Sequence, residues 1–202
     1  MKKFLVLVSV SLAICATAQN QSHAPRTSSE SQKFTLAWWN QADEETRMGV
    51  LNGISDCMTW DAKKSEFGEP PEQLMGRIEK FYHSHNEAAS MNLLDVWKNV
   101  ASKPSSNKSG DNHGEIWKNA HWYLNGDWWS QVSEAQQLGF VEGYLWCLKT
   151  QVSAPTESYS ASASSYRRKI DAFVRANPKL GKEAVAITLR RYRDQDAVPA
   201  PK

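Results

Sequence analysis

The sequence contains only three cysteines and lacks the spaced cysteine and histidine motifs that bind zinc. Neither Cys-x-x-Cys nor His-Glu-x-x-His occurs, although these are common zinc-binding patterns. His83 and His85 lie two residues apart, so on a helix their rings would point to different faces. A metal site would then need Asp111, His113 or Glu115 to join them. The sequence therefore predicts no metal site and no cofactor.

The chain also lacks a large net charge and a catalytic signature. It has 24 Lys and Arg against 22 Asp and Glu, a net charge of +2 at pH 7. This total does not indicate nucleic acid or another polyanion as a partner. No Gly-x-Ser-x-Gly motif, phosphate-binding loop or nucleophile–base pattern is present. These absences favour a non-enzymatic protein.

Long apolar runs are missing, apart from a short one near the N-terminus. Met1-Lys2-Lys3 precedes the apolar residues 4–14, and Ala16-Thr17-Ala18 places small residues at positions −3 and −1 of a cleavage site. A membrane span would need about 20 apolar residues. We therefore predict a signal peptide at 1–18, cleavage near Ala18 and a periplasmic or secreted product without a membrane span. Cys15 allows a lipoprotein as an alternative, although the residue before it is bulky.

An internal repeat is the strongest positive signal. Residues 38–59 match residues 128–149 without a gap, with seven identities in 22 positions, where background composition would give about one or two. The repeat predicts two pseudo-equivalent halves. The identical pairs are Trp38/Trp128, Trp39/Trp129, Gln41/Gln131, Glu44/Glu134, Gly49/Gly139, Gly53/Gly143 and Cys57/Cys147.

Apolar residues recur at helical spacing in both halves, and strand-like alternation is nowhere sustained. Asp43 and Ser133 are good N-cap residues, and they predict helices near 44–60 and 134–151. A second helix begins near Pro71 in the first half. Its partner in the second half ends at Asn177, before Pro178. A third helix is expected in each half, over residues 93–100 and 185–192.

We therefore expect an all-α fold in which two tandem pseudo-equivalent three-helix units form one helical domain. The polar segments between and beside the two units lack periodicity. The predicted organisation is a flexible leader at 19–33, helical repeat 1 at 34–101, a linker at 102–114, helical repeat 2 at 115–195 and a tail at 196–202.

Glycines at a spacing of four indicate a close helix crossing. Gly49, Gly53 and Cys57 share one helix face, because residues four apart turn by about 40° on a helix. A glycine inside a helix costs about 1 kcal/mol of stability relative to alanine, so a stripe of glycines along one helix face requires an explanation. A close approach of another helix backbone provides it. We expect this helix to cross the helix that carries Gly139 and Gly143.

The crossing would bring equivalent residues together near a pseudo-twofold axis. Cys57 and Cys147 would then face each other, and export supplies an oxidising compartment. We predict Cα atoms within about 7 Å and favour a disulfide. The alternative is two buried free cysteines that act as small apolar residues.

Nine tryptophans are present, and four of them repeat with the fold. The repeated pairs are predicted to anchor the helix starts. The alternative is a stacking platform for a ligand, for which the second half has the denser aromatic cluster. The candidate ligand groove consists of Trp117, Trp122, Tyr123, Asp127, Trp128 and Trp129.

Two further features carry weaker functional hypotheses. Residues 165–193 contain nine Lys and Arg but only Asp171 and Glu183, which indicates either solvated basic helix faces or a docking surface for an acidic partner. Glu142 is a candidate acid for glycoside hydrolysis, a reaction that needs two carboxyl groups. Its counterpart in the repeat is Asn52, so the halves do not supply a symmetric pair.

The Gly-x-x-x-Gly-x-x-x-Cys helix, the segment Lys169–Pro178 and the apolar helix after it resemble exported bacterial helical proteins of unknown function. More distantly, they resemble periplasmic immunity proteins of type VI secretion amidase effectors. The resemblance covers each half separately. It implies an all-α fold, no cofactor and inhibition of a toxin by direct binding. The chain departs from those proteins in its duplication, its many tryptophans and its one stripe cysteine per half, so no inhibitory residue can be carried over.

The sequence therefore favours an exported, non-enzymatic binding protein that inhibits or sequesters a protein partner. A glycan or cell-wall binding module with a Trp-rich groove is the alternative, and a hydrolase is the third hypothesis.

Overall fold

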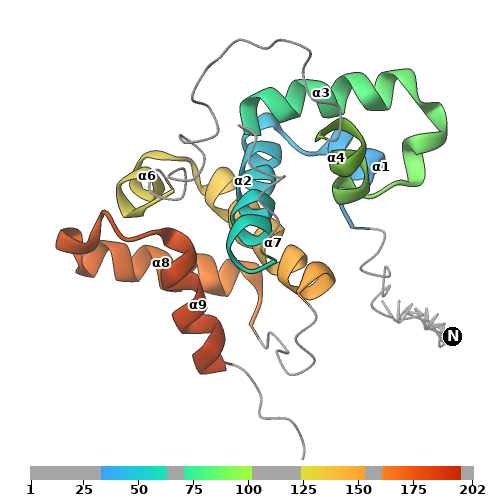
Figure 1. Ribbon diagram of the computed structural model, residues 1–202. Helices are drawn as coiled ribbons and strands as arrows, with labels where there is room; N and C mark the ends of the chain where they lie inside the picture. Colours follow the sequence, from blue (N-terminus) through green and yellow to red (C-terminus); the bar gives the residue numbers. More distant parts are fainter. Residues whose placement is uncertain (1–32, 63–70, 102–123, 153–160, 197–202) are drawn as a thin grey trace, which may run out of the picture.

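The computed structural model describes residues 33–62, 71–101, 124–152 and 161–196 (Figure 1). Within these ranges the protein is all-α, as the sequence predicts, and the only strand-like pairing is an isolated bridge between Asn125 and Ala184. The predicted signal peptide, the linker and most of the leader and the tail lie outside the described residues.

The described elements follow the same order in both halves, and the helices predicted at 44–60 and 134–151 have those bounds. The first half contains α1 (Leu36–Gln41), α2 (Glu44–Trp60), α3 (Pro71–Ser84), the 3₁₀ helix η3 (Asn86–Ser90) and α4 (Leu93–Ala101). The second contains α6 (Gly126–Gln131), α7 (Glu134–Gln151), α8 (Ala163–Ala176), the 3₁₀ helix η5 (Pro178–Leu180) and α9 (Val185–Asp196). The short helices α1 and α6, which contain the tryptophan pairs, were not predicted from the sequence.

Side-chain caps explain where the two central helices begin. The Asp43 carboxylate accepts a hydrogen bond of 2.7 Å from the backbone N–H of Thr46 at the start of α2. The Ser133 hydroxyl accepts one of 3.2 Å from the N–H of Gln136 at the start of α7. Each cap satisfies a donor that has no partner inside the helix.

Equivalent backbone hydrogen bonds join the last helix of each half to the residue that lies two positions before its first helix. The Leu93 N–H at the start of α4 donates to the Phe34 carbonyl at 2.8 Å, and the Val185 N–H at the start of α9 donates to the Leu124 carbonyl at 2.8 Å. The acceptors are 90 residues apart, as in the repeat of 38–59 at 128–149. The donors are 92 apart, as are the expected third helices at 93–100 and 185–192, so two residues are inserted in the second half before its last two helices. The two halves therefore close in the same way.

Helices α2 and α7 cross at the centre of the molecule (Figure 1). The pair α3 and α4 packs on the side of α2, and the pair α8 and α9 packs on the side of α7. Every residue of α2 from Gly49 to Met58 is buried, because this helix has neighbours on all sides. Among the described helices, none combines the length and apolar composition that a membrane crossing would require.

Candidate functional site

The four predicted glycines line the crossing of α2 and α7. A Cβ atom placed on Gly49, Gly53, Gly139 or Gly143 would lie less than 3.0 Å from a backbone atom of the opposite helix. Real Cβ atoms do not come this close to other heavy atoms. The glycines therefore permit an approach of two backbones that any other residue would obstruct.

The glycine contacts are reciprocal. Gly49 faces the backbone of Gln136 and Phe140, and Gly139 faces the backbone of Thr46 and Val50. The second set is the first set moved by 90 residues with the helices exchanged. A surface that meets its own equivalent in this way is isologous, the kind of contact that a twofold axis produces.

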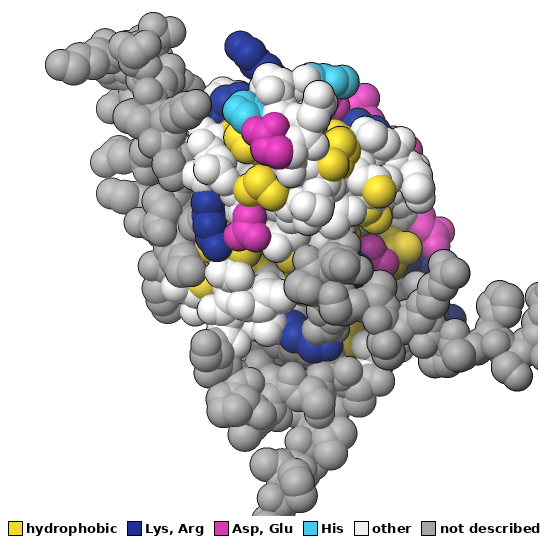
Figure 2. Space-filling model, turned by 90° about the vertical axis from the view of Figure 1, so that its right-hand side faces the viewer, with side chains coloured by type: hydrophobic (Ala, Val, Ile, Leu, Met, Phe, Trp, Pro, Cys, Tyr) yellow, Lys and Arg dark blue, Asp and Glu magenta, His cyan; other side chains and the backbone are white. Residues whose placement is uncertain are grey.

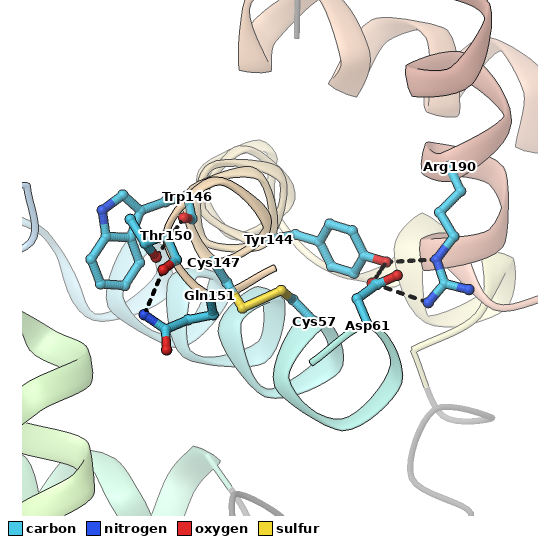
Figure 3. Close-up of a disulfide and its surroundings, with 8 residues drawn as sticks. All are labelled: Cys57, Asp61, Tyr144, Trp146, Cys147, Thr150, Gln151 and Arg190. Atoms are coloured by element: carbon cyan, nitrogen blue, oxygen red, sulfur yellow. Dashed lines mark hydrogen bonds and ion pairs between the residues drawn. A yellow bond between two sulfur atoms is a disulfide. The ribbon is translucent and has the colours of Figure 1, made fainter. Parts of the chain in front are cut away.

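Cys57 and Cys147 extend this crossing at its end. Their Cα atoms are 6.1 Å apart, within the distance predicted from the sequence, and the two sulfur atoms are drawn as a disulfide in Figure 3. Both side chains are fully buried. The pair lies between helices that are 90 residues apart in the chain.

A polar cluster lies beside the cysteine pair (Figure 3). The Tyr144 hydroxyl of α7 donates to Asp61 Oδ2 at 2.5 Å, and Asp61 is the C-cap residue of α2. Arg190 of α9 donates from Nε to the Tyr144 oxygen at 2.9 Å and from one terminal nitrogen to Asp61 Oδ2 at 3.1 Å. The cluster therefore joins three helices, and it was not foreseen from the sequence.

Asp56 is a second, more deeply buried carboxyl group near this cluster. Burial raises its pKa to about 8, the nearby Asp61 carboxylate adds to this effect, and Arg190 opposes it. Its Oδ2 atom has no hydrogen-bond partner in the described part of the chain. Burial also raises the pKa of Tyr144 well above its usual value. Asp56 is only 5% exposed, and the three side chains of the cluster hydrogen-bond to one another, so the cluster has the geometry of a cross-link between helices.

An open pocket lies in the first half, between α1, α2, α3 and η3. We call it the Arg47 pocket; its volume is about 370 Å³. The Arg47 guanidinium lies 5.1 Å from the centre of the Trp39 ring, and its NH1 atom is 3.1 Å from Glu79 Oε1. The full set of lining residues is Leu36, Trp39, Asn40, Arg47, Glu79, Tyr82, His83 and Asn86.

Figure 2 shows the side of the molecule on which α1, α3 and α4 lie. Acidic, basic and histidine side chains are interspersed there with small apolar patches. No broad area of one charge is visible on this face, so local pairs of charges dominate its electrostatics.

The predicted Trp-rich groove is only partly covered by the described residues. Trp129 is fully buried in the core, so its assignment to an open groove is wrong. The reason is that the helical turn of α6 places it against Phe140, whose ring centre is 6.3 Å away. Trp128 is half-buried and packs on the same core, and Asp127 is exposed. Trp117, Trp122 and Tyr123 lie outside the described residues.

The other sequence candidates are dispersed. Glu142 is half-buried on α7, and its counterpart Asn52 is buried on α2. His83 lines the Arg47 pocket, whereas the His85 ring stacks on Phe81 with ring centres 4.2 Å apart. In the part of the chain that the structure describes, no three His, Cys, Asp or Glu residues form a group that could hold a metal ion.

The basic segment at 165–193 forms α8, η5 and the start of α9. Four of its arginines pair with carboxylates: Arg167 with Glu134 at 2.8 Å, Arg175 with Asp171 at 2.7 Å, Arg190 with Asp61, and Arg191 with Glu183. The remaining exposed side chains include two large aliphatic ones, Leu180 and Ile187, which are 44% and 43% exposed. We define the η5–α9 surface as Lys179, Leu180, Lys182, Ile187 and Arg191, all of them exposed.

Comparison with known proteins gives no indication of function, so the function is inferred from the geometry of the structure. No protein-family model, curated protein or solved structure matches the chain. Of the features described above, the glycine stripe and the cysteine pair have a sequence signal in the repeat. The sequence signal for the Arg47 pocket is weaker. It consists of a difference between the halves, because the repeat aligns Arg47 with Gln137.

Proposed function

We propose that this protein is an exported, non-enzymatic binding protein that inhibits or sequesters a protein partner, with the η5–α9 surface as the contact. The observation that carries the proposal is the coincidence of two features on one short segment. Leu180 and Ile187 are the large hydrophobic side chains exposed in the described residues. Exposed basic residues occur close to them in the sequence, at Lys179, Lys182 and Arg191.

This combination suits an acidic protein surface. Aliphatic side chains supply the apolar centre of an interface, and cations around them attract carboxylates and set the orientation. Glu183 pairs with Arg191 at 2.8 Å, so one cation is already held in place. A glycan usually requires exposed aromatic rings, and the described tryptophans supply few: Trp39, Trp97, Trp129 and Trp146 are all buried.

The rest of the molecule supports a binding role through rigidity. The close crossing of α2 and α7, the cysteine pair and the Asp61–Tyr144–Arg190 cluster link the two halves at three places. A rigid surface loses little conformational freedom on binding, which improves affinity. The signal peptide predicted at 1–18 supports export, and the resemblance to immunity proteins supports inhibition.

The test compares Lys182→Glu with Lys80→Glu, which makes the same charge change at an exposed site on α3. Exported proteins retained by the wild-type protein are identified, purified and titrated against all three proteins. We expect an acidic partner whose affinity falls at least about tenfold in Lys182→Glu and with added salt, but not in Lys80→Glu.

Three results would contradict the proposal. The first is equal affinity of the Lys182→Glu variant for the purified partner. The second is saturable binding to immobilised peptidoglycan or polysaccharide without a protein partner, which would favour the glycan-binding alternative. The third is binding only to anionic lipid vesicles, which would assign the same surface to a membrane.

A further inference from the structure

The Arg47 pocket contains a cation and an anion whose hydrogen-bonding capacity is only partly used. A guanidinium has five N–H donors, and in the described residues Arg47 uses one nitrogen, NH1, toward Glu79 Oε1. Its Nε atom is buried and has no hydrogen-bond partner there, so a ligand would reach Arg47 through the terminal nitrogens of a side chain that is 21% exposed. The Glu79 side chain is 43% exposed and can accept further hydrogen bonds. Both charges therefore remain available to a ligand.

The charged pair is also held in position before any ligand arrives. Trp39 is only 3% exposed, and its ring lies beneath the Arg47 guanidinium, which is the geometry of a cation–π contact. Tyr82 forms another part of the wall, and burial raises its pKa to about 12, so it remains neutral. Fixed charges in a preformed pocket lower the entropic cost of binding.

The second half has a different arrangement at the equivalent positions. The position equivalent to Arg47 is Gln137, which donates to the Trp129 carbonyl at 2.7 Å and accepts from Arg167 at 3.2 Å. The position equivalent to Glu79 is Asp171, which pairs with Arg175. There the polar groups satisfy one another within the protein. The pair of Arg47 and Glu79 is therefore specific to the first half, where the second half has a hydrogen bond from Arg167 to Gln137.

We propose that the Arg47 pocket binds an α-amino acid through its charged head group, with the ligand carboxylate on Arg47 and the ligand ammonium on Glu79. The site carries one charge of each sign. A simple anion is therefore repelled by Glu79, and a simple cation is repelled by Arg47. A sugar cannot stack on the Trp39 ring, because the Arg47 guanidinium already covers it. A zwitterion forms a favourable ion pair with each of the two charges.

The size and the wall of the pocket narrow the ligand class further. A volume of about 370 Å³ accommodates a single amino acid. Leu36 lines the pocket and is half-buried, which provides an apolar contact for an aliphatic side chain. Leucine and valine are therefore the probes of choice. This site is separate from the η5–α9 surface and does not depend on the function proposed above.

The experiment is calorimetric titration of the purified mature protein with leucine and valine. Leucinamide lacks the carboxylate, N-acetyl-leucine lacks the ammonium, and the dipeptide Leu-Leu carries the two charges on different residues. We expect leucine to bind with a Kd below about 1 mM and the three modified ligands to bind at least about tenfold more weakly. Tight binding of Leu-Leu alone would identify a peptide, not an amino acid, as the ligand and would overturn the proposal.

The matched variants are Glu79→Gln and Asp171→Asn, which neutralise equivalent acidic residues of the two halves. Leucine affinity should fall at least about tenfold in Glu79→Gln and stay unchanged in Asp171→Asn. Arg47→Gln should abolish binding, and its thermal midpoint shows whether it folds. Absence of leucine binding at about 10 mM, or equal binding by wild type and Glu79→Gln, would refute the proposal.

Discussion

Asp56 is a carboxylic acid held almost entirely out of water by the helices around α2. Its ordinary pKa of 3.8 rises to about 8 in the folded protein, chiefly through burial. The folded state therefore binds the proton more tightly than the unfolded state does. This contribution to stability is complete below pH 4 and is lost progressively as the pH rises from about 4 to about 8.

Replacing this residue should consequently stabilise the protein at neutral pH. Asp56→Asn has nearly the same shape as the protonated acid and cannot ionise. We expect its gain over wild type to be near zero at pH 4 and to grow to at most about 4 kcal/mol at pH 7. Urea unfolding of both proteins at several pH values measures this difference. A gain that is independent of pH would show that ionisation of Asp56 is not its cause.

At the scale of the element, the stripe glycines and Gly76 form an internal comparison. Gly53 and Gly143 face backbone atoms of the opposite helix, whereas a Cβ on Gly76 of α3 would meet nothing within 4 Å. All three lie inside helices, so the intrinsic preference for alanine is the same at each position. Only the surroundings differ.

Alanine substitutions should therefore have opposite signs at these positions. Gly76→Ala should raise stability by about 0.5–1 kcal/mol, because alanine is the better helix former. Gly53→Ala and Gly143→Ala should each lower it by about 1–3 kcal/mol or more, because the two helices must move apart. Thermal and chemical unfolding measure both effects. A higher midpoint for Gly53→Ala would rule out the close crossing.

At the scale of the whole molecule, the cysteine pair links two halves that are far apart in the chain. A bond across 90 residues restricts the unfolded chain and should stabilise the fold by about 4–5 kcal/mol on the chain-entropy model. Thiol labelling of the mature protein, denatured without reductant, should detect no free cysteine. The double variant Cys57→Ala/Cys147→Ala should lose about that stability. Two reactive thiols per chain would identify the pair as reduced.

Local sequence patterns predict the two central helices and the contact between them. Asp43 and Ser133 mark helix starts through caps that involve residues only three positions away, so this information is local. The spacing of Gly49, Gly53 and Cys57 fixes a single helix face, because an α-helix has an invariant period. The repeat then matches this face to an equivalent one. Together these features predicted the all-α class, the helix bounds and the proximity of the cysteines.

The tertiary structure alone decided which polar side chains meet. Tyr144 and Arg190 lie 83 and 129 residues from Asp61, and nothing in the local sequence of any of them marks the contact. Trp129 illustrates the same limit. The aromatic residues around it in the sequence suggested an exposed ligand groove, whereas the packing of α6 places Trp129 in the core. Local sequence sets helix geometry through backbone hydrogen bonds. Burial, pKa and pocket shape arise from neighbours that only the folded chain brings together.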